Sequence, residues 1–307
     1  MRGNNNIDRR TFLKVAGLSG LAPIATQASS QTRRTAWTRF AFLNDIHLPS
    51  SGQNHNFKRL IRSVEDEHKA DFIIFGGDNV FAIESADQKI AKAQLANWSS
   101  QVAENVTVPF YTLLGNHDLW GWAHNSPGDK SLARRMAQDA FRMPGRYYTF
   151  ERGGWRFIIL DSIQQGPFGY STSIDEEQLS WLSKELPKTA VPTILCTHAP
   201  LLSVTGMLLT MPGPTHLTPR FAPNRLVSNT RQVLKLLDAN ANVKAVLSGH
   251  THMRDEVKYK HARHVCAGAV CGAWWKGDYE GFGPTVTLVD ISADGHFRHR
   301  FLDWSPG

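Results

Sequence analysis

The chain has 307 residues, of which 41% are hydrophobic and 20% charged, and its formal net charge is +7. This composition excludes collagen-like, coiled-coil and wholly disordered chains, and no apolar run approaches the roughly 20 residues that a membrane-spanning helix needs. Three cysteines are too few for a disulfide framework or a structural zinc site. Beyond residue 28 the net charge is only +4, and no cluster of Lys and Arg predicts a nucleic-acid-binding surface.

The N-terminal segment has the pattern of an export signal over residues 1–28. Asp8-Arg9-Arg10-Thr11-Phe12-Leu13-Lys14 precedes a mild apolar stretch, and Ala25-Thr26-Gln27-Ala28 resembles a small-residue cleavage site. The paired arginines resemble the twin-arginine signal of bacteria, which implies the twin-arginine export machinery as a partner and a periplasmic or extracellular location. The alternative is an amphipathic N-terminal helix, which the glycines and weak periodicity disfavour. A polar linker is predicted over 29–37 and one domain over 38–307.

One local pattern then recurs five times: an apolar run, a turn, and then His, Asp or Asn. The apolar runs are Phe40–Leu43, Phe72–Phe75, Phe110–Leu114, Thr193–Cys196 and Val243–Leu247. Continuous apolar runs predict strands buried on both faces, and helix-like segments such as Phe57–His68 and Ile90–Val102 lie between several of them. In open α/β sheets, ligands gather beyond the carboxyl ends of the strands. We therefore expect the five polar segments to build one compact site.

These polar segments, taken in order, resemble those of the calcineurin-like metallophosphoesterases, over most of residues 38–255. The segments are Asn44-Asp45-Ile46-His47, Gly76-Gly77-Asp78-Asn79, Gly115-Asn116-His117-Asp118, Thr197-His198-Ala199-Pro200 and Ser248-Gly249-His250-Thr251-His252. The resemblance implies an α/β fold, a four-layer α/β/β/α sandwich with two mixed sheets and the metal site at the carboxyl ends of strands. It also implies an enzyme that hydrolyses a small phosphoester substrate.

The same resemblance implies a centre for two divalent or mixed-valence metal ions. The implied ligands are Asp45, His47 and His252 for one ion, Asn116, His198 and His250 for the other, and Asp78 for both. Carboxylate and amide oxygens combined with imidazole nitrogens suit Mn, Fe or Zn better than Ca²⁺ or Cu(I).

For catalysis, the resemblance implies hydroxide activated by the metals as the nucleophile and His117 as the general acid, with Asp118 as the residue that orients it. Two alternatives stay open: His117 is a structural histidine, or the chain is a non-catalytic metal-binding protein that retains the fold. The five segments do not indicate whether the substrate is a phosphodiester or a phosphomonoester. Phe81 stands where purple acid phosphatases carry a tyrosine, so no tyrosinate-to-iron absorption band is expected.

Several further side chains carry weaker expectations. Cys266 and Cys271 either form a disulfide or pack as small buried hydrophobes, and the second interpretation is favoured. Trp120, Trp122, Trp274 and Trp275 follow motif segments, where they stack on an aromatic part of the substrate or, as most tryptophans do, pack in the core. Near the end of the sequence, Thr285–Ile291 and His296–Phe301 flank Ser292-Ala293-Asp294-Gly295 and predict a hairpin that closes a sheet.

Overall fold

The computed structural model describes residues 36–124, 126, 129–167, 169–211, 220–221 and 224–306. The predicted export signal, residues 1–28, and most of the predicted linker lie outside these residues. The chain divides into two units, Met1–Arg34 and Thr35–Gly307, and the description below concerns the second. Among the described residues, no helix is long and apolar enough to cross a membrane.

One sheet is built from the first three predicted strands and the C-terminal hairpin. Its strands are β1 (Trp37–Leu43), β2 (Phe72–Phe75), β3 (Phe110–Thr112), β14 (Thr285–Ser292) and β15 (Phe297–Asp303), in the spatial order β15-β14-β1-β2-β3. The sheet is mixed, because β1, β2 and β3 run parallel while β14 is antiparallel to both β1 and β15. The predicted hairpin is confirmed, and it lies beside the first strand of the domain.

The second sheet carries the two remaining predicted strands at its centre. Its strands are β12 (Arg254–Tyr259), β13 (Ala262–Ala267), β11 (Val243–Ser248), β8 (Thr193–Cys196), β5 (Trp155–Ile159) and β4 (Tyr148–Arg152), in that spatial order. The four inner strands are parallel and the two edge strands are antiparallel to their neighbours. Two short ribbons complete the strands: β6 (Ile163–Gly166) with β7 (Gly169–Thr172), and β9 (Thr210–Met211) with β10 (Arg220–Phe221).

Alternation along β1 shows how the layers are assembled. Phe40 and Phe42 point into the apolar layer between the two sheets, where Phe40 meets Phe157 of β5 edge to face at 5.4 Å. Ala41 and Leu43 point the other way, into the core beneath the helices. Because both faces of the strand are covered, its sequence is continuously apolar rather than alternating.

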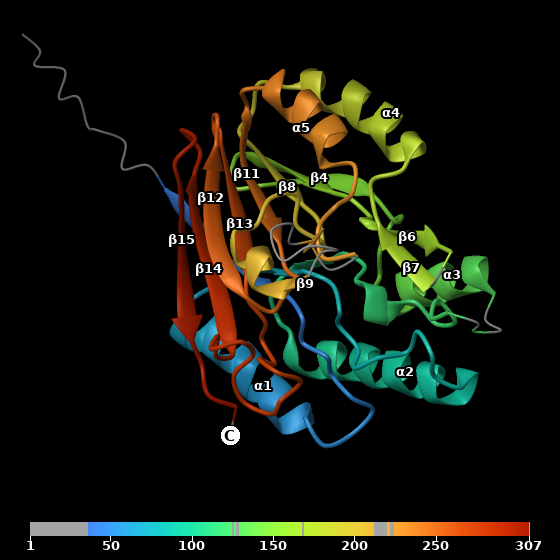
Figure 1. The fold of residues 1–307 in the computed structure, drawn as a ribbon. Coiled ribbons are helices and arrows are strands. Elements are labelled where there is room, and N and C mark those ends of the chain that lie inside the picture. Colours follow the sequence, from blue (N-terminus) through green and yellow to red (C-terminus); the bar gives the residue numbers. More distant parts are fainter. Residues whose placement is uncertain are drawn as a thin grey trace, which may run out of the picture. The chain divides into compact units, whose positions relative to one another are not determined.

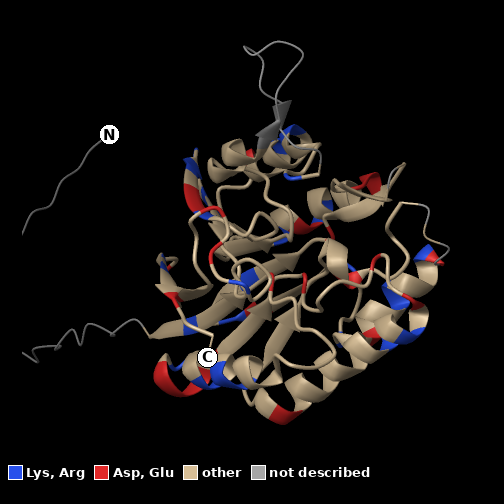
Figure 2. Ribbon diagram, turned by 60° about the horizontal axis from the view of Figure 1, so that its bottom comes forward, with Lys and Arg blue, Asp and Glu red and all other residues tan. Residues whose placement is uncertain are grey.

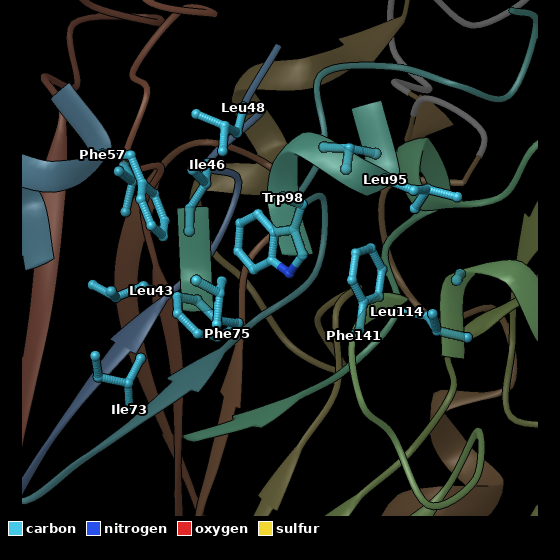
Figure 3. Packing of buried hydrophobic residues seen from close by; sticks show 14 of the residues in the cluster. Leu43, Ile46, Leu48, Phe57, Ile73, Phe75, Leu95, Trp98, Leu114 and Phe141 are labelled. Atoms are coloured by element: carbon cyan, nitrogen blue, oxygen red, sulfur yellow. The ribbon is translucent and has the colours of Figure 1, made fainter. Parts of the chain in front are cut away.

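Helices cover the outer face of each sheet, as Figure 1 shows. The first sheet packs against α1 (Asn54–Arg62), α2 (Gln88–Asn105) and α3 (Lys130–Ala140), and the second against α4 (Glu176–Glu185) and α5 (Thr230–Asp238). Figure 3 shows Trp98 of α2 between Phe57, Phe75 and Phe141; its ring lies 4.9 Å from that of Phe75. The predicted α/β/β/α sandwich with two mixed sheets is thus confirmed.

The helical segments differ from the prediction in one detail. The segment expected as one helix over Phe57–His68 is α1 followed by a π-helical stretch, Ser63–Glu67. Short 3₁₀ turns occur at Asn116–Asp118, Leu186–Lys188 and Thr205–Leu209. Figure 2 shows basic and acidic residues interspersed over the helices that cover the sheets.

Candidate metal centre

The five polar segments meet where the parallel strands of the two sheets end. Asp45 and His47 follow β1, Asp78 follows β2, and Asn116 lies in the 3₁₀ turn after β3. The second sheet contributes His198 after β8, and His250 and His252 after β11. All seven side chains belong to residues that are at most 4% exposed. The strands therefore deliver every ligand implied by the sequence to one edge of the sandwich.

The first group of donors lies around Asp45 and His47. The Nε2 atoms of His47 and His252 are 3.2 Å apart, and His252 Nε2 lies 3.6 Å from Asp45 Oδ1. Asp78 Oδ2 lies 3.8 Å from His47 Nε2. These separations suit donors that face a common cation rather than one another.

The second group is built on His198 and shares Asp78 with the first. His198 Nε2 lies 3.2 Å from Asp78 Oδ2 and 3.2 Å from His250 Nδ1. Two of the possible metal-binding groups among the described residues are thus Asp45 with His47 and Asp78, and Asp78 with His198 and His250. A third group, His47 with His252 and Cys271, includes a cysteine that is not among the ligands implied by the sequence.

Two buried oxygen atoms test whether this donor set fits a metal. Asp45 Oδ1 and Asn116 Oδ1 are inaccessible to solvent and have no hydrogen-bond partner. An unsatisfied buried acceptor costs about 1–3 kcal/mol, so such atoms are expected to have a partner that the protein alone does not provide. Coordination of a cation satisfies both, and the residues therefore fit the implied metals.

Backbone carbonyl groups fix the orientation of the four imidazole rings. The Nδ1–H groups of three rings donate to Phe81 O (His47, 2.7 Å), Gly76 O (His198, 3.0 Å) and Gly272 O (His252, 2.6 Å). Because a carbonyl oxygen only accepts, each contact places the proton of the neutral ring on Nδ1 and leaves Nε2 as the atom that can bind a metal. His250 has the opposite orientation. Its Nε2 faces Asn224 O at 2.6 Å, so Nδ1 is the ring nitrogen that can bind a metal.

The polypeptide reaches these positions through left-handed backbone conformations. The φ angles are 50° at Asp45, 47° at His47, 51° at Asp78, 73° at His250 and 60° at His252. Such conformations are unfavourable for residues other than glycine and cluster at functional sites. The turns direct side chains from successive strands toward one point.

A glycine allows one of these close approaches. Gly77 has a φ of +92°, and a Cβ atom there would lie 2.6 Å from Nδ1 of His198. Only glycine combines that backbone conformation with that contact.

Burial and neighbouring charges set the protonation of the donors. Burial, reinforced by His198, lowers the pKa of His250 to about 3, and burial lowers the pKa of His47 well below its usual value. Burial alone would raise the pKa of Asp78, but the neighbouring imidazoles, His198 above all, hold it well below its ordinary value. For His198, burial would lower the pKa, but the carboxylates of Asp78 and Asp45 outweigh it and raise the pKa to about 9. Because metal binding requires a neutral imidazole, His198 must release its proton when a metal ion binds.

His117 lies next to the donors but outside the metal-binding groups. Its ring centroid is 5.0 Å from that of His47, and its Nδ1 pairs with Glu84 Oε1 at 2.9 Å. Burial would lower the pKa of His117, but the carboxylates of Asp78 and Glu84 outweigh it and raise the pKa to about 9. Glu84 was not predicted from the sequence, because it follows no apolar run and belongs to no motif segment.

Asp118 has a different role from the one expected. Its carboxylate accepts hydrogen bonds from the backbone N–H groups of Asn79 (2.8 Å), Val80 (3.1 Å) and Gly115 (2.9 Å), and from the side chain of Asn79. The prediction that Asp118 orients His117 is wrong, since Glu84 occupies that position. Asp118 instead ties the loop after β2 to the loop after β3.

The aromatic and cysteine residues divide between the core and the centre. Trp122 is 2% exposed and packs in the core. Trp274 is partly exposed, and its ring lies 4.5 Å from that of His252, with the two planes tilted by 30°. The three cysteines are free and buried, so Cys266 and Cys271 form no disulfide. Cys196 packs between the two sheets.

Comparison with known proteins agrees with this geometry. The calcineurin-like phosphoesterase family matches residues 38–254. A 3',5'-cyclic-nucleotide phosphodiesterase of Nostoc is 25% identical over 235 residues, which are 73% of each chain. A dimetal phosphatase structure from Danio rerio has a TM-score of 0.59 at 12% identity and covers 87% of this chain and 99% of its own.

The same fold also occurs in a protein described by a different role. The structure of GAP50, the anchor in the inner membrane complex of Plasmodium, has a TM-score of 0.56 at 18% identity and covers 87% of this chain and 84% of its own. These structural likenesses show the fold, whereas the family match extends over the whole set of strand-end segments. The chain therefore belongs to the calcineurin-like phosphoesterase family, which makes it a metal-dependent phosphoester hydrolase.

Proposed function

We propose that the chain hydrolyses a phosphodiester with two metal ions held at the strand ends. The observation that carries this proposal is the position of Asp78 Oδ2, 3.8 Å from His47 Nε2 and 3.2 Å from His198 Nε2. A carboxylate shared by two histidine groups is suited to bridge two cations. When bound, such a pair of ions supplies activated water and positive charge where the phosphoryl oxygens become more negative.

In this proposal, each residue of the site has one of three roles: metal ligand, proton donor or support of the proton donor. One ion would be held by Asp45, His47 and His252, the other by Asn116, His198 and His250, and Asp78 would contact both. His117 would donate a proton to the leaving oxygen, because it lies beside the donors without belonging to them. Glu84 would hold the His117 ring with Nδ1 protonated, which leaves Nε2 free to face the substrate.

A cyclic nucleotide is the substrate class that we infer. The Nostoc relative is named as a 3',5'-cyclic-nucleotide phosphodiesterase. In this chain, the partly exposed rings of Trp274 and Tyr279 lie beside His252, at 4.5 Å and 5.4 Å from its centroid. Aromatic rings at that place are suited to stack on a base. The leaving group of such a substrate is an alkoxide, which needs the proton of His117 more than a phenoxide does.

Turnover of three substrates by one metal-analysed preparation tests the proposal. We expect 3',5'-cyclic AMP and bis(nitrophenyl) phosphate to be hydrolysed faster than mononitrophenyl phosphate, with two metal ions per chain. Faster cleavage of the monoester would overturn the diester assignment. A fully metal-loaded protein that is inactive on all three would favour the alternative of a non-catalytic metal-binding protein.

Replacement of His117 tests its role separately. The His117→Ala variant is expected to retain its metal ions and to lose turnover, by about 10²–10⁴-fold for cyclic AMP. The loss should be much smaller for bis(nitrophenyl) phosphate, whose leaving group needs no proton. Equal losses for both substrates would remove the general-acid assignment and leave His117 with a structural role.

We also propose that residues 1–28 direct the protein through the twin-arginine pathway to the periplasm or beyond. The support is the sequence Arg9-Arg10-Thr11-Phe12-Leu13-Lys14 followed by a mild apolar stretch and small residues. Replacement of both arginines by lysine is expected to keep the full-length protein in the cytoplasm of the bacterial host. Unchanged export of that variant would refute the assignment.

A further inference from the structure

Cys271 lies inside the candidate metal centre, although the implied ligand set contains no thiol. Cys271 is fully buried. Its Sγ forms a possible metal-binding group with one ring nitrogen of His47 and one of His252. All three atoms lie within 4.8 Å of one another. Beside them, Asp45 Oδ1 is buried without a hydrogen-bond partner. A thiol, two imidazoles and a carboxylate oxygen therefore face the same small volume.

Backbone hydrogen bonds hold Cys271 against the turn that carries Asp45 and His47. Val270 N donates to Asn44 O at 3.0 Å, and Cys271 N donates to Asp45 O at 3.2 Å. The next residue, Gly272, accepts the Nδ1–H of His252 through its carbonyl oxygen. The position of the sulfur is thus fixed by the same contacts that orient two of the candidate ligands.

The segment after Cys271 turns back over this residue. Trp275 N donates to the backbone carbonyl of Cys271 at 2.8 Å, and the Cys271 thiol donates to Gly272 O at 3.5 Å. Burial raises the pKa of this thiol well above its ordinary value. The backbones of Trp274 and Trp275 have left-handed conformations, with φ angles of 51° and 67°. Cys271 is therefore held by its own backbone contacts and covered by this left-handed turn.

The other two cysteines show how a cysteine that only fills space is placed in this fold. Cys196 packs in the apolar layer between the sheets. Cys266 has Thr251 Oγ1 as a partner at 3.2 Å and belongs to none of the possible metal-binding groups among the described residues. Cys271 alone combines complete burial with imidazole nitrogens from two candidate ligands.

We propose that Cys271 is a thiolate ligand of the metal ion held by Asp45, His47 and His252. The inference rests on the proposed two-metal centre. On binding, the S–H bond breaks, a sulfur–metal bond forms and the proton leaves to solvent, so that no oxidant or reductant is needed. Because thiolate is a soft ligand, this position should select Zn or Fe over Mn.

Cobalt substitution tests the proposal without reference to turnover. The protein loaded with Co²⁺ should show visible d–d bands from the whole centre and a near-ultraviolet thiolate-to-cobalt band. Cys271→Ala should lose the near-ultraviolet band and keep the d–d bands. The matched control, Cys266→Ala, removes a buried thiol nearby and should keep both. Persistence of the near-ultraviolet band in Cys271→Ala, or its absence from the unaltered protein, would overturn the assignment.

X-ray absorption on the unaltered zinc protein gives a second readout that needs no variant. A sulfur scatterer at about 2.3 Å is expected beside N and O ligands at about 2.0–2.2 Å. A shell of N and O alone would refute the thiolate ligand while leaving the two-metal proposal intact. Failure to bind Co²⁺ or Zn²⁺ at all would instead refute the proposed centre itself, so the two failures are distinguishable.

Discussion

The layer between the two sheets and the edge where the strands end are both buried, but they are built on opposite principles. Between the sheets, apolar side chains such as Phe40 and Phe157 leave extended strands and meet as aromatic pairs. At the edge, five of the seven candidate ligands have left-handed backbones, and two buried oxygens have no partner. Each left-handed residue costs about 1–2 kcal/mol. The comparison teaches that the apolar layers supply the stability that holds a strained polar site in place.

We expect Asp78→Ala to have the largest effect on the metal centre while leaving the apolar layer between the sheets intact. Turnover should fall by about 10⁴-fold or more, because both ions lose their shared ligand. Metal analysis should show fewer than two ions per chain, while thermal unfolding in chelator should not move to lower temperature. The control is Asp303→Ala, which removes a carboxylate whose side chain is 75% exposed. Two retained ions in Asp78→Ala would contradict the bridging role.

The converse change, Phe157→Ala, breaks the layer and spares the site. Its ring contacts those of Phe40, Phe72 and Phe150, so removal should lower the free energy of unfolding by about 3–5 kcal/mol. Urea unfolding measures this change, and turnover per folded molecule should stay within about twofold of the original. Trp37→Ala, at a 40% exposed position, is the control and should cost far less. A large loss of turnover in folded Phe157→Ala would show that the two regions are not separable.

Glu84→Gln sharpens the comparison within the site. Gln keeps the size of the side chain but removes the charge beside His117, so turnover of cyclic AMP should fall by about 10–100-fold. Metal content and bis(nitrophenyl) phosphate turnover should change little. Glu104→Gln, on an exposed position of α2, is the matched control. Loss of metal in Glu84→Gln would indicate a role in the metal centre instead.

The smallest effect concerns a left-handed residue far from the site. Lys69 has a φ of 54° and is exposed, so Lys69→Gly should raise the free energy of unfolding by about 0.5–1 kcal/mol. The same substitution at Lys58, exposed in the right-handed helix α1, should lower it by about 1 kcal/mol. Chemical denaturation measures both. The same sign for both variants would contradict the strain assigned to left-handed positions.

The strands were predictable because each is covered on both faces. Phe72–Phe75 and Thr193–Cys196 begin and end at the predicted residues, since every residue of each strand is buried and none is charged. The pattern was less informative for helices: the periodicity over Phe57–His68 does not distinguish an α-helix from the π-helical stretch after Arg62.

Contacts made by turns were not predictable. Glu84 reaches His117 from a loop without an apolar run, and no spacing rule connects the two residues. Asp118 follows His117 in the sequence, which favoured a contact between them, yet three backbone N–H groups from neighbouring loops satisfy its carboxylate. The approach of Cys271 to His47 depends on the pairing of distant segments, and the sequence shows only a lone cysteine.

The strand order carries a consequence for how this protein is made. β1 leaves the ribosome first, yet one of its edges stays open until β14 has been translated, because the two strands pair from Trp37 to Phe42. A prematurely terminated nascent chain ending before Thr285 would expose that edge, and unpaired edges recruit other chains. Truncated products should therefore aggregate, and only a chain that extends through β14 closes that edge of the sheet.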